Sequence, residues 1–167
     1  MPQRRLRFTI HGEPLPKQRA RSFNPRTKQG DLIFKNGKPI IDTKTPDKTK
    51  AYEQYVALMA RQAAAQSGLQ QPVPLRTPIT LGCIFYLPIP PSWSPKKKAR
   101  ARTGELEHTS RPDLSNLLKS IEDGAEGVLW KNDSQINAYG TVDGELPKKL
   151  YSDKPRVEIE MVWFEPD

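Results

Sequence analysis

The chain has 167 residues, 35% of them apolar and 28% charged. This is enough for one domain with its own core, and the 17 prolines favour long polar loops over disorder throughout. No apolar run approaches the roughly 18 residues of a membrane span, and no apolar segment follows the arginines of residues 1–7. We therefore expect no membrane span, no secretory signal and a cytoplasmic protein. The single cysteine, Cys83, agrees with a reducing compartment.

The net charge of +8 is unevenly distributed along the chain. Residues 1–50 hold thirteen lysines and arginines against four acidic residues, whereas residues 108–167 hold seven against twelve. A basic surface beside a group of carboxylates is typical of a protein that grips phosphates next to a metal site. A basic surface that only aids solubility explains the charge alone equally well.

The first predicted element is a strand at residues 5–10, where Leu6, Phe8 and Ile10 alternate with polar residues. Residues 11–45 hold no hydrophobic period, and their prolines and interleaved cations indicate a long basic loop. We call residues 11–45 the arm.

Residues 46–67 carry apolar side chains at helical spacing and predict the first long helix. We expect a linker at residues 72–78 and an apolar strand at residues 79–87, in the centre of the sheet. Residues 95–102 contain five cations in seven positions, which fits a solvated helix face and a contact with a DNA backbone about equally.

A second long helix is predicted at about residues 113–125, followed by strands at residues 135–142 and 156–164. No repeat and no glycine-rich phosphate loop occurs, so we expect no small-molecule cofactor. The elements predict a single α+β domain over residues 1–167, with a mixed sheet of four to five strands and two main helices packed on it.

The most informative segment spans residues 108–136. Its helix has one apolar stripe, which we expect to pack on the sheet. Asp113 stands where it can cap the helix, and four polar residues are predicted on the opposite face: Asn116, Lys119, Ser120 and Asp123.

Asp133 follows in a short loop between this helix and the next strand. One or two carboxylates suffice for a Mg²⁺ site when water and phosphate oxygens complete the coordination, so Asp113 and Asp133 are candidate ligands. Taken alone, Asp113 fits a cap better than a ligand, and Asp133 fits a turn residue.

The paired blocks RPDLSNLLKSIED and VLWKNDSQI closely resemble the pattern of the RusA family of Holliday junction resolvases. That pattern is a basic residue, Asp-x-Asp-Asn-Leu-x-Lys, a short helix, an aromatic residue, a polar residue, Asp-Asp and then Gln-Val or Gln-Ile. The two blocks and their spacing are specific. His108 and a basic arm near the N-terminus also occur in phage-borne members.

The resemblance implies a role for each matching position. Asp113 and Asp133 match metal-binding, catalytic aspartates, and Lys119 matches an essential catalytic lysine. The chain departs from the founding members at Ser115 and at Asn132, where they have aspartates. The missing carboxylate at position 115 makes Asp123 a candidate third metal ligand, with Glu122 as an alternative. Ser115, Asn116 and His108 remain candidate site residues.

The resemblance also implies a homodimer that binds four-way DNA junctions and nicks two strands symmetrically, with Mg²⁺ or Mn²⁺ in each site. The cations expected to contact DNA are Lys17, Arg19, Arg21, Lys96, Lys97, Lys98 and Arg111. Two alternatives stay open. One is a relative that binds branched DNA without cutting it, favoured by Ser115. The other is a basic RNA-binding protein, which explains the charge but not the polar helix face.

Overall fold

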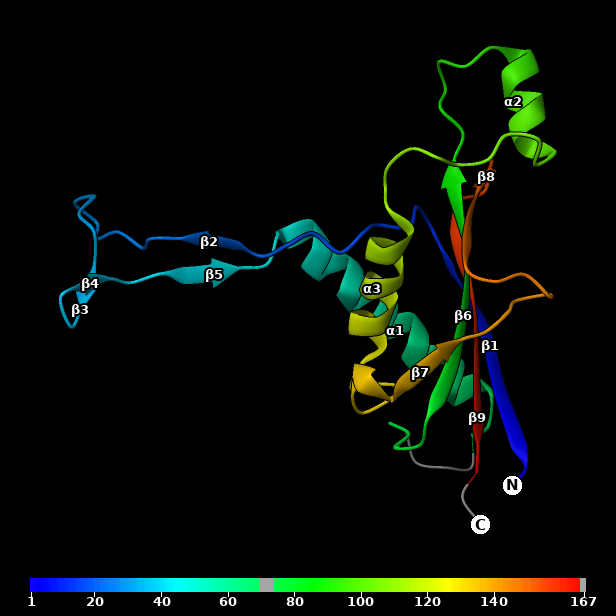
Figure 1. Ribbon diagram of the computed structural model, residues 1–167, viewed down its shortest axis with the longest axis horizontal. Coiled ribbons are helices and arrows are strands. Elements are labelled where there is room, and N and C mark those ends of the chain that lie inside the picture. Colours follow the sequence, from blue (N-terminus) through cyan, green and yellow to red (C-terminus); the bar gives the residue numbers. More distant parts are fainter. Residues whose placement is uncertain (70–73, 166–167) are drawn as a thin grey trace.

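The protein is described here by a computed structural model that covers residues 1–69 and 74–165. Its centre is a five-stranded mixed sheet (Figure 1). The strands are β1 (Gln3–His11), β6 (Ile79–Pro88), β7 (Ile136–Tyr139), β8 (Lys148–Ser152) and β9 (Arg156–Phe164). Their order is β1-β9-β6-β7, and β8 pairs with β6 further along the same edge. The strand at residues 79–87 was expected in the centre of the sheet, and this is confirmed.

The hydrophobic period of β9 determines which side of the sheet becomes the core. Val157, Ile159, Met161 and Trp163 are all buried, whereas the residues between them are only partly buried. The outer face carries ion pairs instead, such as Arg5 with Glu160. Helices therefore cover one face of the sheet.

Two long helices, α1 (Asp47–Gln66) and α3 (Leu114–Ala125), cover that face (Figure 1). The predicted apolar stripe of α3 is confirmed, since Leu117, Ile121 and Ala125 are fully buried. Gly124 lets the helices approach closely, because a Cβ there would lie 2.7 Å from Val56. Its nearest neighbours also include the Glu53 backbone, so the crossing brings Glu53 of α1 close to the end of α3.

A third helix, α2 (Pro95–Arg102), begins at the N-cap Ser94, whose hydroxyl accepts a hydrogen bond from the Lys97 backbone. It packs beside β8, a strand that sequence reasoning missed. The residues of β8 are all half-buried with no alternation, so they carry no strand period.

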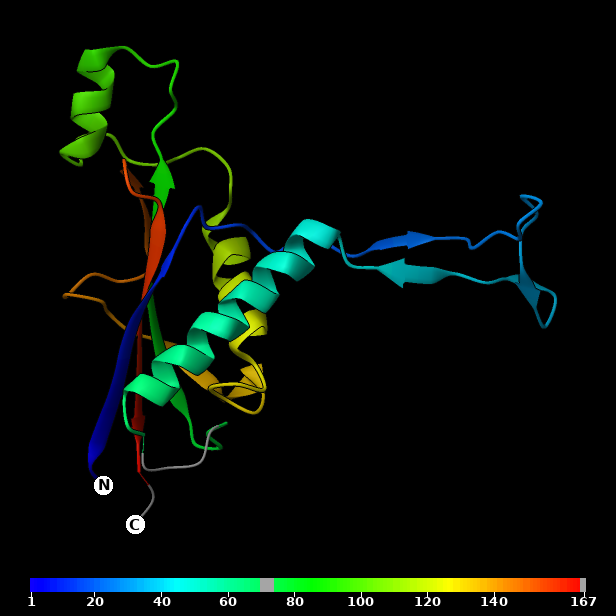
Figure 2. The ribbon, with the colours of Figure 1, turned by 180° about the vertical axis from the view of Figure 1, so that it is seen from behind.

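The arm is not the structureless loop that the sequence predicted. Its outer part is a hairpin that projects away from the sheet and the helices, as both views show (Figures 1 and 2). β2 (Arg21–Phe23) pairs with β5 (Asp42–Lys44), and β3 (Phe34–Lys35) pairs with β4 (Lys38–Pro39) near the tip. These strands are two or three residues long and fully exposed, so no alternation of apolar and polar residues announces them.

The α+β class and the mixed sheet are confirmed, with α2 as a third helix beside the two expected ones. Residues 72–73 of the predicted linker lie outside the described part of the chain. Within residues 1–69 and 74–165, no helix combines the length and the apolar character needed to cross a membrane.

Candidate active site

The candidate site lies along the polar face of α3. Asp113 is the N-cap residue, but its carboxylate makes no capping hydrogen bond within the described residues. It lies instead 3.5 Å from the Asn116 amide nitrogen. Of the four residues expected on this face, Ser120 is the exception: it is buried, and its hydroxyl donates to the Leu117 carbonyl. Asp113 therefore occupies the N-cap position of α3, but its side chain does not cap the helix.

Asp133 is positioned by a short 3-10 helix, η1 (Asp133–Gln135), which follows the loop after α3. Asn132 caps η1 by accepting from the Ser134 backbone, and the Gln135 side chain accepts from the Asn132 backbone. The Gln135 amide also donates to the carbonyls of Leu75 and Thr77, in the segment that precedes β6. Asn132, which stands where the family pattern has an aspartate, thus stabilises the start of η1. Asp133 is the first residue of this 3-10 helix.

Lys119 connects α3 with η1. Its ammonium donates to Asp133 Oδ2 at 2.5 Å and lies 3.1 Å from Asp123 Oδ1. The hydrogen bond to Asp133 is the main reason why the pKa of Lys119 is raised, although burial opposes the shift. The same hydrogen bond lowers the pKa of Asp133. Both groups are therefore charged over a wide range of pH.

A second lysine enters the site from the arm. Lys17 lies 2.5 Å from Glu53 and 3.0 Å from Asp123, and its backbone nitrogen donates to the Asn116 carbonyl. Burial disfavours the Lys17 ammonium, but the two carboxylates outweigh it and raise the pKa of Lys17. The sequence assigned Lys17 to DNA contact, whereas in the structure its side chain is held by two carboxylates inside the site.

Three carboxylates form a compact group that we call the acidic cluster: Asp123, Glu126 and Asp133. One oxygen from each lies within 4.8 Å of the others. These are hard oxygen donors and fit a divalent cation such as Mg²⁺ or Mn²⁺, and the Lys119 ammonium contacts two of them, Asp123 and Asp133. Asp113 is not a member. About 15 Å of helix rise separates it from Asp123, too far for one ion to bind both.

Asp113 instead lines a groove of about 860 Å³ between the root of the arm and the start of α3. Four residues expected from the sequence to contact DNA also line it: Lys17, Arg19, Arg21 and Arg111. Asn116 also lines it, and the same helix leads from there to Lys119 and the acidic cluster. The groove therefore brings predicted DNA-binding residues from two distant segments next to a predicted catalytic aspartate.

The loop that enters α3 is held from β8. The Lys149 ammonium donates to the Ser110 carbonyl at 2.8 Å and to the Pro112 carbonyl at 2.9 Å. His108, a candidate site residue, lies further back in this loop and stacks at 4.6 Å on Tyr151. Burial and the charge of Lys149 lower the pKa of His108. Its observed contacts are structural and lie outside the acidic cluster.

Helix α2, which carries Lys96, Lys97 and Lys98, is set apart from α3 (Figure 1). The Lys97 ammonium sits 3.9 Å from the centre of the Trp93 ring, and Trp93 in turn contacts Tyr151. Lys96 is exposed, whereas Lys98 is partly buried on the same helix. These cations can meet DNA only if it extends beyond the groove.

Asp123 and Glu122, the two candidates to replace the carboxylate that the family has at position 115, lie in different environments. Asp123 belongs to the acidic cluster, whereas Glu122 is buried and accepts a hydrogen bond from the Tyr139 hydroxyl at 2.5 Å. Burial and the neighbouring Glu122 raise the pKa of Tyr139 to about 12. Ser115 is exposed in the first turn of α3, two turns away from Asp123.

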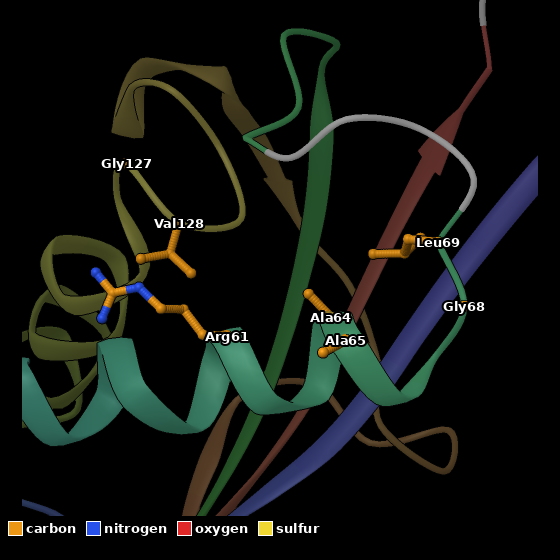
Figure 3. Close-up of a pocket in the computed structure, with 7 residues that line it drawn as sticks. All are labelled: Arg61, Ala64, Ala65, Gly68, Leu69, Gly127 and Val128. Carbon is orange, nitrogen blue, oxygen red and sulfur yellow. The ribbon is translucent and has the colours of Figure 1, made fainter.

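Another hollow, of about 430 Å³, lies between the end of α1 and the loop after α3 (Figure 3). Arg61 is the only charged residue among the described ones that line it, and the rest are small or apolar. It offers no group of catalytic side chains.

Sequence reasoning missed two acidic residues of the site. Glu53 is partly buried on α1, but nothing in the sequence separates it from an ordinary solvated residue. Glu126 follows Asp123 by three residues, at the end of α3, and this spacing on one helix face was the available signal.

Comparison with known proteins agrees with this geometry. The protein-family profile described as endodeoxyribonuclease RusA matches residues 11–162. The chain is also 33% identical over 156 residues to the "Uncharacterized protein YqaN" of Bacillus subtilis (strain 168). That match covers 92% of this chain and 93% of the relative. RusA proteins are endodeoxyribonucleases of Holliday junctions. The match extends over the arm, the three α-helices and most of the sheet apart from β1, and the chain belongs to the RusA endodeoxyribonuclease family.

Proposed function

We propose that this protein is a divalent-metal-dependent endonuclease that resolves four-way DNA junctions by paired, symmetric nicks. The observation that carries the proposal is the acidic cluster beside Lys119, at the end of a cation-lined groove, in a chain that matches the family profile over residues 11–162. Carboxylates, an ammonium and a basic groove are the parts that phosphodiester cleavage needs.

In this proposal, Asp123, Glu126 and Asp133 hold the ion. Bound there, Mg²⁺ or Mn²⁺ would supply an activated water and offset charge on the attacked phosphate. Lys119 and Lys17 both contact Asp123, so with an ion held by the cluster their ammonium groups would lie where they can meet the negative charge that develops on the phosphate. Asp113 acts from the groove end of α3 and does not bind the same ion.

The DNA contacts follow from the groove. Arg19, Arg21 and Arg111 face the space that leads to Asp113, and each can neutralise one backbone phosphate. The cations of α2, Lys96–Lys98, bind a more distant part of the same DNA. Symmetric nicking needs two sites in a fixed relation, so we propose a homodimer with two-fold symmetry.

One gel assay tests the activity. A mobile four-way junction with one labelled strand is incubated with the protein in Mg²⁺, in Mn²⁺ and in EDTA. Paired nicks at symmetric positions are expected with either ion and no cutting in EDTA. Light scattering at micromolar concentration should give the mass of a dimer. Intact junctions under all three conditions would exclude the nuclease.

A second candidate function is binding of branched DNA without cleavage. Ser115 and Asn132 favour it, because each occupies a position where the founding members have a carboxylate. The same gel separates the two functions, since a binding-only protein shifts the junction and leaves its strands intact in both metals.

A further inference from the structure

The hairpin formed by residues 21–44 projects far from the helices and the sheet (Figures 1 and 2). It holds six lysines and arginines against two aspartates. The groove is lined by residues 13–21 of the arm. Neither the groove nor the acidic cluster gives a function to the part of the hairpin beyond them. Its charge and its distance from the body indicate an interaction surface.

The tip of the hairpin has a defined shape. Asn36 and Gly37 connect β3 and β4, and their positive φ angles of 51° and 74° are those of a tight two-residue turn. The Ile40 nitrogen donates to the Ile33 carbonyl, and the Ile33 nitrogen donates to the Pro25 carbonyl. These hydrogen bonds connect the turn to the strand that brings the chain outward, so the tip is held in one arrangement.

The side chains at the tip are unfavourable for a hairpin that meets only water. Lys35 and Lys38 are directly opposite in the register, and like charges at such positions destabilise a strand pair. Phe34 pairs with Pro39 and is 58% exposed. A polyanion with accessible rings would relieve both problems, since phosphates neutralise the lysines and a base covers the phenylalanine.

Nucleic acid fits this tip better than a second copy of the chain does. Contact between two hairpins would bring together like charges, whereas a phosphate backbone is complementary to them along the whole length. Within a continuous duplex the bases are stacked on one another and closed to a side chain. Where duplex arms meet, that stacking is interrupted, and a narrow projecting tip can reach a base.

We propose that Phe34 stacks on a base at the branch point of a DNA junction, while Lys35 and Lys38 bind the flanking phosphates. This inference rests on the proposed junction function and adds the element that distinguishes a junction from plain duplex. In this proposal the groove binds both duplex and branched DNA, and the hairpin tip provides the specificity for branched DNA.

The test uses the full-length protein in EDTA, so that binding is measured without cutting. Junctions with 5-iodouracil at the branch point are irradiated, and the crosslinked peptide is identified by mass spectrometry. Affinities for the junction and for a linear duplex of the same sequence are measured for wild type, Phe34→Leu and Phe34→Trp. Phe164→Leu is the matched control, because Phe164 is 52% exposed on β9 in the sheet.

The crosslink is expected on the peptide that contains Phe34. Phe34→Leu should lose it and bind the junction about tenfold more weakly, with duplex affinity unchanged. Phe34→Trp and Phe164→Leu should bind the junction as wild type does. Circular dichroism confirms that each variant is folded.

Three results would overturn the inference. They are a crosslink elsewhere with Phe34→Leu binding as wild type, an equal loss of affinity for junction and duplex, or a fall in molar mass showing that Phe34 contacts a second copy. Parallel assays in Mg²⁺ keep the two proposals apart. If the protein nicks junctions but Phe34→Leu binds them as wild type does, only the proposed contact of Phe34 is wrong. If the crosslink forms but no junction is nicked, only the proposed nuclease activity is wrong.

Discussion

Lys119 Nζ lies 2.5 Å from Asp133 Oδ2, so a side chain from the middle of α3 contacts the first residue of η1. The two residues are separated by fourteen positions in the chain. The ammonium is also 3.1 Å from Asp123, so Lys119 contacts two members of the acidic cluster, and Lys17 contacts one of them. A divalent cation at the cluster must compete with both lysines.

Replacing Lys119 by methionine should therefore separate metal binding from catalysis. Without the Lys119 ammonium the cluster loses one neutralising charge, while Lys17 stays beside Asp123, so we expect Mn²⁺ to bind several-fold more tightly. Nicking should fall by about 10²-fold or more, because the charge that meets the developing phosphate charge is lost. Electron paramagnetic resonance titration of Mn²⁺ and single-turnover nicking measure the two effects. Lys154→Met is the control, since Lys154 is exposed in the turn before β9. Weaker Mn²⁺ binding in Lys119→Met would contradict this reading.

Asp133 and Asp113 should differ in what their loss removes. Asp133→Asn takes a carboxylate from the acidic cluster, so both Mn²⁺ affinity and nicking should be lost. Asp113→Asn should also stop nicking but leave Mn²⁺ affinity at the cluster unchanged, because Asp113 lines the groove. Junction affinity in EDTA should persist in both. Asp143→Asn is the matched control, since Asp143 pairs with Arg7 away from the site. Equal loss of Mn²⁺ affinity in both variants would place Asp113 at the same ion.

Neighbouring positions 122 and 123 provide a sharper comparison. Asp123→Asn should abolish nicking, since it removes a cluster ligand and a partner of both site lysines. Glu122→Gln should retain nicking and instead lower stability by about 1 kcal/mol through its weakened, partly buried hydrogen bond with Tyr139. Nicking rates and urea denaturation measure the pair. Full activity in Asp123→Asn would remove the cluster from the mechanism.

Ser115→Asp restores a carboxylate of the founding pattern. Position 115 is exposed in the first turn of α3, where a negative charge is favourable for the helix dipole, so folding should not suffer. We expect activity to be kept and the Mg²⁺ requirement to change little, because about 12 Å of helix rise separates position 115 from Asp123 of the acidic cluster. Nicking is measured against Mg²⁺ concentration. An inactive wild type that gains cutting through Ser115→Asp would support the binding-only function.

The shifted pKa values of the central pair predict how its effect on stability depends on pH. The pKa of Asp133 is lowered in the folded protein, so its contribution is present above the ordinary aspartate range and is lost as pH falls through the lower folded value. The pKa of Lys119 is raised, so its contribution is present below the ordinary lysine range and is lost only as pH rises through the folded value.

The stability difference between wild type and Asp133→Asn should thus be constant from about pH 5 to about pH 9 and shrink below about pH 4. It should also be small, since the two side chains are 43% and 35% exposed and solvent screens them. Urea denaturation at a series of pH values measures it. A difference that changes steeply between pH 6 and pH 8 would require another titrating group.

Local patterns in the sequence were enough for the central elements of the fold. The alternation in β9 and the apolar stripe of α3 each reflect a single element buried against a single face, so their periods appear directly in the residue order. The short exposed strands of the hairpin and the half-buried β8 have no such contrast and were not predicted. The family pattern identified Asp133 and Lys119 as candidates without any information on distance.

Only the tertiary structure decided which candidates meet. The close crossing at Gly124 puts Glu53 and the end of α3 together, and the path through η1 brings Asp133 back to Lys119. Asp113 shares a helix with Asp123, yet the rise of that helix keeps them apart. Sequence spacing cannot give these results, because contacts between elements depend on how their buried faces pack, and many packings are compatible with the same local pattern.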